Sequence, residues 1–438
     1  MKYTQKIIFL FIAIYFFSCN STTHKTVEIS KDEIKKYENI FKNLKEYLSK
    51  ENGELWNNQL YGPILFVNRK NRVIIANEKD TKGILNKKEK IYVGFLPDNI
   101  NIANTAFAWN GKRWTMVMLP LPKNYNEQLN LLTHELFHRI QAETGFENLH
   151  QKSCDHLDNK EGRIYLKLEL EALKKALNTE NENRQKEHIK DALLFREYRY
   201  QIFPNAKKHE NLLELNEGLA EYTGTTLSDR NDKDLKTHYI NAIEKLYENL
   251  TFVSSFAYRT IPVYGYYMKQ NDKTWNLKIS DTTNLTDYII DFFNISVPEK
   301  LNDTILLIRD RYNYAQINSF ETERDIKQKE LFAKLDIIFQ ENPILIIPFQ
   351  NMNISYNPGN LIPYKDLGTV YPNLRVVDNW GILTVEKGAL VDKDWKKVIV
   401  SAPTKTSDKI IEGDGWNLEL KNNWELVKVD DNYILKEK

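Results

Sequence analysis

The chain has 438 residues, enough for two or three domains with substantial hydrophobic cores. Hydrophobic residues make up 42% of it and charged residues 28%, and the formal net charge is +1. This composition excludes a disordered chain. The balanced charge also provides neither a basic surface for nucleic acid nor an acidic tail.

The N-terminal segment has the pattern of an export signal. Two lysines precede an apolar run, Ile7 to Phe17, which is too short to cross a bilayer as a helix but fits a signal-peptide core. Ser18 directly before Cys19 resembles the lipobox of bacterial lipoproteins. The resemblance implies that residues 1–18 are removed and that a lipid on Cys19 anchors the protein in the cell envelope of a Gram-negative bacterium. A secretory signal with an incidental cysteine, or a signal anchor, is the alternative.

Residues 19–122 are expected to form a tether, one helix and a small sheet. The sequence "SKDE" at Ser30 to Glu33 reads as a capping box that opens a helix ending near Lys50. Two stretches, "ILFVNRKNRVIIAN" and "AFAWNGKRWTMVMLP", predict hairpins, and Asn110-Gly111 suits the tight turn of the second. The piece "KIYVGFL" between them predicts a further strand.

Residues 123–340 are expected to be mainly helical. Between Asn124 and Glu143, four apolar residues fall on one stripe of a helix: Leu129, Leu132, Leu136 and Ile140. From Pro343 onward short strands and turns dominate, so residues 341–438 predict a separate β-sandwich-like domain. The expected class is therefore α+β, with an N-terminal mixed sheet and zincin-like active-site helix, a large helical region and a C-terminal β domain. Four tryptophans of the last domain suit either its core or an aromatic binding platform: Trp380, Trp395, Trp416 and Trp424.

The stretch "LLTHELFHRIQ" contains the pattern H-E-x-x-H. His134 and His138 are four residues apart, so on a helix both imidazoles point to one side and can share one metal ion. A zinc ion lowers the pKa of a bound water to about 7, and the adjacent Glu135 can take the proton of that water as a general base. Because a catalytic zinc has three protein ligands, a third ligand is required elsewhere in the chain.

The pair "HELFH" and "NEGLAEY" resembles the gluzincin metallopeptidases, the superfamily that includes thermolysin. The resemblance implies that Glu217 is the third zinc ligand and that Glu221 orients a liganding histidine, with Asn216 beside them. It also implies that the last hairpin of the sheet supplies an edge strand along the cleft. The arrangement is further similar to a group of bacterial lipoproteins with peptidase-like catalytic cores.

Glu217 follows His138 by 79 positions, a longer connection than the superfamily usually has. The segment 146–210 is therefore expected to be a helical insertion. The resemblance also implies a tyrosine or histidine that stabilises the oxyanion of the transition state. Tyr258 and Tyr264 are the candidates.

These patterns predict a zinc-dependent hydrolase that cleaves peptide bonds in a peptide or protein substrate. We expect a monomer that is attached to the membrane through Cys19 and does not bind nucleic acid. The alternative is a lipid-anchored surface binding protein whose zinc site is structural or vestigial.

Overall fold

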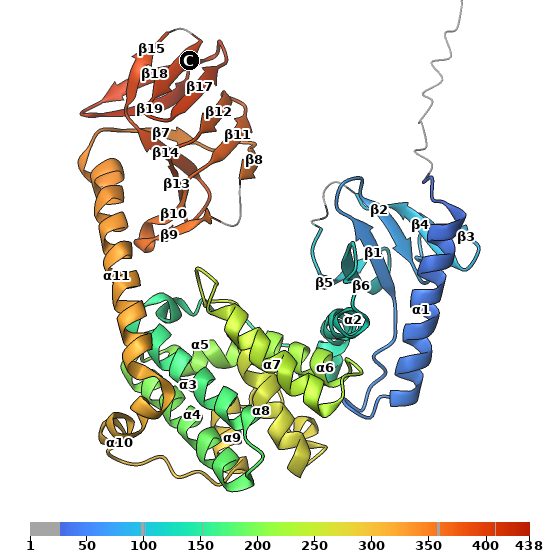
Figure 1. The fold of residues 1–438 in the computed structure, drawn as a ribbon. Coiled ribbons are helices and arrows are strands. Elements are labelled where there is room, and N and C mark those ends of the chain that lie inside the picture. Colours follow the sequence, from blue (N-terminus) through green and yellow to red (C-terminus); the bar gives the residue numbers. More distant parts are fainter. Residues whose placement is uncertain (1–26, 98–99, 101, 151, 357–359, 408) are drawn as a thin grey trace, which may run out of the picture. The chain divides into compact units, whose positions relative to one another are not determined.

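The computed structural model describes residues 27–438 except 98–99, 101, 151, 357–359 and 408 (Figure 1). The expected signal peptide and Cys19 lie outside these residues. The fold is α+β, as predicted, and the chain divides into two compact units, Met1–Tyr312 and Asn313–Lys438. Among the described helices, none is both long and apolar enough to cross a membrane.

The first unit begins with α1, Lys31–Glu51, which starts at the predicted capping box. The side chain of Ser30 accepts a hydrogen bond from the Glu33 amide, and the Glu33 carboxylate accepts one from the Ser30 amide. The apolar side of α1 packs on a six-stranded sheet, where Phe41 stacks on Phe66 with 4.8 Å between the ring centroids. The strands are β1 Ile64–Asn68, β2 Val73–Ala76, β3 Asn86–Lys88, β4 Ile91–Phe95, β5 Thr105–Trp109 and β6 Lys112–Leu119.

The strand order is β3-β4-β2-β1-β6-β5, so the central β1 is covered on both faces and β5 forms an edge. Only the β1–β6 pair is parallel among the pairs of this sheet. Both predicted hairpins are present. In the second, Asn110 and Gly111 adopt the positive φ values, 47° and 78°, that a two-residue turn requires.

The rest of the first unit is helical. Its helices are α2 Tyr125–Ile140, α3 Lys160–Asn178, α4 Glu182–Ile202, α5 Ala206–Leu213, α6 Leu219–Thr226, α7 Asp232–Leu246, α8 Ala257–Asn271, α9 Leu285–Phe292 and α10 Leu301–Ile308. A π-helical segment, Glu214–Gly218, joins α5 to α6 without a break. Short 3-10 turns occupy Gln141–Thr144, Asp155–Asp158, Trp275–Lys278 and Arg309–Tyr312. The expected insertion is helical, because it consists mainly of α3 and α4 packed side by side.

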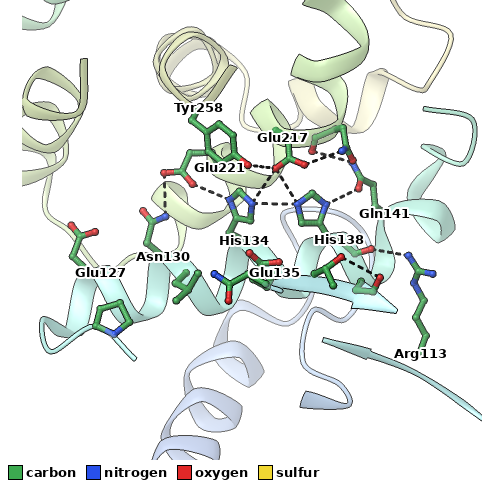
Figure 2. A pocket seen from close by; sticks show the side chains of 16 residues that line it. Arg113, Glu127, Asn130, His134, Glu135, His138, Gln141, Glu217, Glu221 and Tyr258 are labelled. Atoms are coloured by element: carbon green, nitrogen blue, oxygen red, sulfur yellow. Dashed lines mark hydrogen bonds and ion pairs between the residues drawn. The ribbon is translucent and has the colours of Figure 1, made fainter. Parts of the chain in front are cut away.

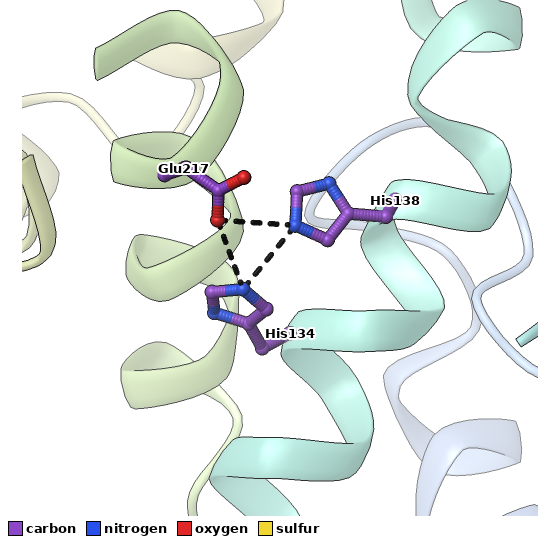
Figure 3. A group of neighbouring side chains, drawn as sticks. All are labelled: His134, His138 and Glu217. Carbon is purple, nitrogen blue, oxygen red and sulfur yellow. Dashed lines mark hydrogen bonds and ion pairs between the residues drawn. The ribbon is translucent and has the colours of Figure 1, made fainter. Parts of the chain in front are cut away.

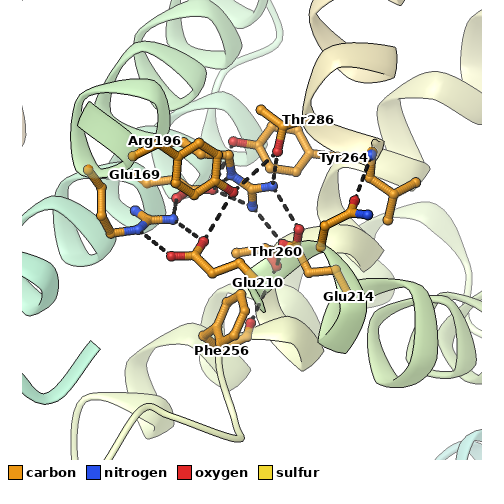
Figure 4. A network of polar contacts seen from close by, with 12 residues as sticks. Glu169, Arg196, Glu210, Glu214, Phe256, Thr260, Tyr264 and Thr286 are labelled. Carbon is orange, nitrogen blue, oxygen red and sulfur yellow. Dashed lines mark hydrogen bonds and ion pairs between the residues drawn. The ribbon is translucent and has the colours of Figure 1, made fainter. Parts of the chain in front are cut away.

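A buried ionic network joins the insertion to the helices that follow it (Figure 4). Arg196 of α4 forms a two-pronged pair with Glu214 at 2.7 and 2.9 Å, and it also pairs with Glu169 of α3. Arg199 of α4 pairs with Glu210 of α5 at 2.6 Å. All five side chains are fully buried. Because Glu214 belongs to the π-helical segment, the network fixes that segment against α4.

The second unit is a β-sandwich with one long helix, α11 Tyr314–Asp336, which continues as a π-helical segment, Ile337–Glu341. One sheet has the order β18-β19-β7-β14-β13-β10-β9 and the other β15-β16-β17-β12-β11-β8. The strands are β7 Ile344–Pro348, β8 Asn353–Tyr356, β9 Ile362–Tyr364, β10 Gly368–Tyr371, β11 Leu374–Asp378, β12 Gly381–Val385, β13 Ala389–Asp392, β14 Lys397–Ser401, β15 Pro403–Thr406, β16 Ile410–Gly413, β17 Trp416–Leu420, β18 Trp424–Val429 and β19 Asn432–Glu437.

One apolar core lies between the two sheets and contains Trp380, Trp416 and Trp424. These three tryptophans therefore belong to the core, whereas Trp395 is 38% exposed. The end of α11 and the π-helical segment after it cover the outer face of the seven-stranded sheet through Leu335 and Phe339. The predicted boundary at residue 341 separated this helix from the β domain, but the structure groups the two together.

Candidate metal site

Helix α2 forms as the sequence predicts and presents both histidines on one side. Its N-cap, Asn124, accepts a hydrogen bond from the Glu127 amide. The predicted apolar stripe is buried, and α2 packs against β5, β6 and α6. The last part of the predicted helix, Gln141–Thr144, forms a 3-10 turn that ends at Gly145, whose φ is 94°. His134 and His138 therefore project from a rigid, buried helix toward α6 (Figure 2).

Glu217 meets these two histidines in space, despite the 79 intervening positions (Figure 3). The two Nε2 atoms are 3.2 Å apart, and Oε2 of Glu217 lies 3.6 Å from that of His134 and 3.5 Å from that of His138. Ligand atoms about 2.0–2.1 Å from a tetrahedral zinc lie about 3.3–3.4 Å from one another. The three donor atoms thus have the separations of one face of a zinc coordination shell.

Hydrogen bonds on the other ring nitrogens fix the tautomers of both histidines. Nδ1 of His134 lies 2.9 Å from Oε2 of Glu221, and Nδ1 of His138 lies 3.0 Å from Oε1 of Gln141. The Gln141 amide is oriented by its own nitrogen, which donates to the carbonyls of Leu215 and Asn216. Both Nδ1 atoms therefore face acceptors and carry the proton in the neutral ring, which leaves the Nε2 lone pairs facing the same point as Glu217.

Three acceptors that converge in this way attract a positive charge. Burial opposes a charge on His134, but the carboxylates of Glu217 and Glu221 outweigh it and raise the pKa of His134 to about 10. Burial also disfavours an ionised Glu217, yet its hydrogen bonds with the two histidines hold the pKa of that carboxyl far below its usual range. The two carboxylates thus favour a positive charge at the site, and a divalent cation that binds there would compete with a proton on His134. The donor set fits a zinc ion.

Glu135 lies beside this triad and lines the same pocket. Its side chain is buried, and its Oε2 atom has no hydrogen-bond partner within the described residues. Burial raises the pKa of this carboxyl. An oxygen without a partner in such a place is available to a water molecule or a substrate, because a buried carboxylate oxygen otherwise requires a donor.

The pocket has a volume of about 640 Å³, and the edge strand β5 contributes Thr105 and Ala106 to its wall. Tyr258 of α8 also lines it. The hydroxyl group of Tyr258 donates to Oε2 of Glu217, and its ring stacks on that of His134 with centroids 5.5 Å apart. The amide of Asn216 donates to the other oxygen of Glu217 at 3.0 Å.

Tyr264, the other predicted oxyanion donor, is not among the residues that line the pocket. It is fully buried, and its hydroxyl group donates to Glu169 of the ionic network at 3.0 Å. Of the two tyrosines, the structure therefore brings only Tyr258 to the triad.

Four residues that contribute to the site were not predicted from the sequence. Gln141 orients His138, and Asn130 donates to Glu221 at 3.3 Å. Gly224 lets α6 approach α2, because a Cβ atom there would lie 2.7 Å from the Asn130 carbonyl oxygen. Arg113 lines the pocket beyond His138. Gln141 lies three residues after His138, and Asn130 lies four residues before His134. This helical spacing is the one sequence signal that could have indicated the two residues.

Comparisons with models of protein families, with curated proteins and with solved structures found no match. What the geometry supports on its own is a possible metal site formed by His134, His138 and Glu217.

Proposed function

We propose that the protein is a zinc-dependent hydrolase, most specifically a metallopeptidase of the gluzincin type. The observation that carries the proposal is the convergence of three lone-pair donors, 3.2–3.6 Å apart, next to a buried carboxylate that has a free oxygen. A structural zinc site has four protein ligands and does not need such a carboxylate. The group found among the described residues has three members, which favours a catalytic site with one open position.

The roles of the side chains follow from their positions. His134, His138 and Glu217 would hold the zinc ion, which supplies Lewis acidity to water and to a carbonyl group when it is bound. Glu135 would accept the proton of the attacking water through Oε2 and pass it to the leaving nitrogen. Tyr258 would donate its hydroxyl proton in a hydrogen bond to the developing oxyanion. Burial and the adjacent Glu217 raise the pKa of Tyr258, so this group stays protonated and can donate.

Peptide is the substrate class that the wall of the pocket favours. The pocket is lined by β5, which is an edge strand and so has main-chain groups that are not used within the sheet. An extended peptide can pair with such an edge, and its main chain is then held beside the triad. This argument supports a peptidase over a hydrolase for compact substrates.

We also propose that the protein works at the cell envelope, exported by residues 1–18 and anchored through a lipid on Cys19. The sequence pattern alone supports this part of the proposal. Labelling with a radioactive fatty acid, compared between wild type and a Cys19→Ala variant, tests it. Equal labelling of the two proteins would rule out the anchor.

The hydrolase proposal is tested by zinc content and peptide cleavage measured on the same preparations. The wild type should bind one zinc ion per chain and cleave some members of a diverse peptide library. Glu135→Gln should keep the zinc and lose roughly 10²–10⁴-fold in rate, because only the base is removed. Glu217→Ala should lose both zinc and activity. A zinc-loaded wild type that cleaves no peptide would reject the peptidase and leave the alternative, a binding protein with a structural or vestigial site.

A further inference from the structure

The pocket follows helix α2 and has charged groups at both ends (Figure 2). Glu127 lies in the first turn of α2. At the other end, the Arg113 guanidinium donates to the carbonyls of Arg139 at 2.9 Å and His138 at 3.3 Å, in the last turn of the helix. The two ends are about 16 Å apart along the helix axis, with the histidines nearer the Arg113 end.

The two charges differ in how they are neutralised. Glu127 accepts a hydrogen bond from Arg230 and lies 3.3 Å from Nδ1 of His238, so its charge is matched inside the protein. Arg113 is exposed and bonds only main-chain carbonyls, and within the described residues it forms no ion pair. Arg139 lies near it and also donates to carbonyls, those of Gln59 and Leu60. Glu143 and Glu78 lie close to Arg139. Among the described residues that line the pocket, Arg113 is the one arginine or lysine, and it lies at the His138 end.

The Arg113 side chain is well placed to bind an anion. Its Nε and Nη2 groups are engaged with the end of α2, which fixes the plane of the guanidinium at the pocket wall. An arginine has five N–H donors, so the Nη1 group and one Nη2 hydrogen remain free. A planar fork of this kind matches the two oxygens of a carboxylate. A fixed donor loses little side-chain entropy on binding.

We propose that Arg113 binds a substrate carboxylate, so that the enzyme prefers peptides with an acidic group on the His138 side of the cleaved bond. The inference rests on the proposed peptidase function and specifies its substrate class. An aspartate or glutamate side chain and the carboxylate at a peptide C-terminus offer the same chemistry. Because Arg113 touches the residue next to a metal ligand, the acidic group would lie within about one or two residues of the cleaved bond.

A purely structural role for Arg113 makes a different prediction. A cation that donates to the last carbonyls of α2 stabilises the helix C-terminus. Loss of such a contact would lower activity on acidic and neutral peptides alike and leave the ratio between them unchanged. The ratio of kcat/KM for an acidic peptide over its neutral parent therefore separates the two roles.

The test uses the full-length, zinc-loaded protein and a neutral peptide with blocked ends that the wild type cleaves. Aspartate is placed at each position around the cleaved bond in turn, and one further peptide is neutral but has a free C-terminal carboxylate. We expect a ratio of about ten at one position for the wild type. Arg113→Gln should reduce it to about one, and Arg113→Glu should favour lysine at the same position. Arg69→Gln, which removes an exposed arginine from the β1–β2 turn, should keep the ratio of the wild type.

A measurement of peptide binding tests the role of Arg113 without relying on cleavage. The acidic and neutral peptides, carrying a fluorophore, are titrated by anisotropy against Glu135→Gln and against Glu135→Gln combined with Arg113→Gln. The acidic peptide should bind about tenfold more tightly, and only when Arg113 is present. Equal affinities, or a ratio that survives in Arg113→Gln, would overturn the carboxylate site. If the wild type cleaves no peptide, the proposed peptidase function fails. Blocked peptides that differ only in one aspartate are then titrated in the same way, and this comparison still decides on Arg113.

Discussion

Glu221 should control the affinity for metal without contacting the ion. Its carboxylate accepts from Nδ1 of His134 at 2.9 Å and thereby holds the Nε2 lone pair toward the ion. Removing such a partner typically costs 10–100-fold in metal affinity. We expect Glu221→Gln to bind zinc roughly 10–100-fold more weakly in competition with a chromophoric chelator. An affinity within twofold of the wild type would show that the tautomer of His134 is set by other contacts.

The two tyrosines of α8 should respond in opposite ways to removal of the hydroxyl group. Tyr258→Phe removes a donor from the pocket, so we expect kcat to fall at least about tenfold while the free energy of unfolding changes little. Tyr264→Phe removes one of the buried donors to Glu169, which keeps those of Arg196 and Arg199, so we expect a loss of about 1–3 kcal/mol in unfolding free energy. Steady-state kinetics and urea titrations of both variants check the assignment. A larger kcat defect in Tyr264→Phe would refute it.

Much of the site can be read from the sequence because it depends on local spacing. His134 and His138 are four residues apart, and the helix beneath them is marked by its apolar stripe. The choice between Tyr258 and Tyr264 does not depend on local spacing. Positions 258 and 264 are six residues apart on one helix, so they point to sides about 240° around from each other. The packing of α8 decides which of its sides faces the triad. The neighbouring residues in the sequence do not indicate this packing.

At the level of elements, the close approach of α6 to α2 depends on Gly224. An added Cβ would lie 2.7 Å from the Asn130 carbonyl oxygen and 3.3 Å from Cβ of His134, so one helix must move. We expect Gly224→Ala to cost about 1–3 kcal/mol through overpacking, even though alanine is the better helix former. Zinc affinity should fall as well, because α6 follows directly on the segment with Glu217. Unchanged affinity in a chelator competition would mean that the helices adjust without moving the ligands.

The ionic network should be essential for the fold of the helical region. Arg196→Met would leave Glu214 and Glu169 buried without their main partner, and breaking a buried pair in this way typically costs about 3–5 kcal/mol. Lys327→Met offers a control, because its pair with Glu323 is mostly exposed and should contribute less than about 1 kcal/mol. Urea titrations measure both changes. Similar losses in the two variants would contradict the importance of the buried pairs.

The type of helix around Glu217 could not be predicted from the sequence. The spacing of Glu217 and Glu221 indicates a helix, but it does not reveal that the first of them lies in a π-helical segment, Glu214–Gly218. Such segments occur often at functional sites, and here Glu214 is held by Arg196 from the insertion. The register of this turn is thus set by a contact between distant parts of the chain. Local propensity carries no signal for it.

At the scale of the molecule, the candidate site belongs entirely to the first unit, and the second unit has a core of its own. The fold class, and the order of helical and β regions, are predictable from the change of hydrophobic periodicity along the chain. The boundary between the two units is not predictable in the same way. Helix α11 has the charge-rich pattern of its helical predecessors, and its contacts with the sheet, among them those of Leu335 and the ion pair of Asp336 with Lys365, assign it to the β domain.

The stability of the whole chain should show the effect of Glu210 as the pH is lowered. Burial by itself would raise the pKa of this carboxyl, but the Arg199 guanidinium outweighs burial and holds the pKa at about 2. In the unfolded chain a glutamate titrates near about 4.3. Because the folded value is the lower one, the carboxylate contributes its full stability above the unfolded value and loses it as the pH falls toward 2.

We therefore compare the metal-free wild type with Glu210→Gln by urea titration between pH 7 and 2.5. The difference in unfolding free energy should be on the order of 3 kcal/mol above pH 5 and shrink steadily below about pH 4.3. Taking the difference at each pH cancels the titration of the groups that do not interact with Glu210; His156, whose Nε2 lies 2.7 Å from Oε1 of Glu210, is the main exception. A difference that stays constant down to pH 2.5 would mean that Glu210 has the same pKa in the folded and the unfolded chain, so that Arg199 does not stabilise its carboxylate. Arg199 would then be neutralised mainly by Glu169, which lies 2.9 Å from it.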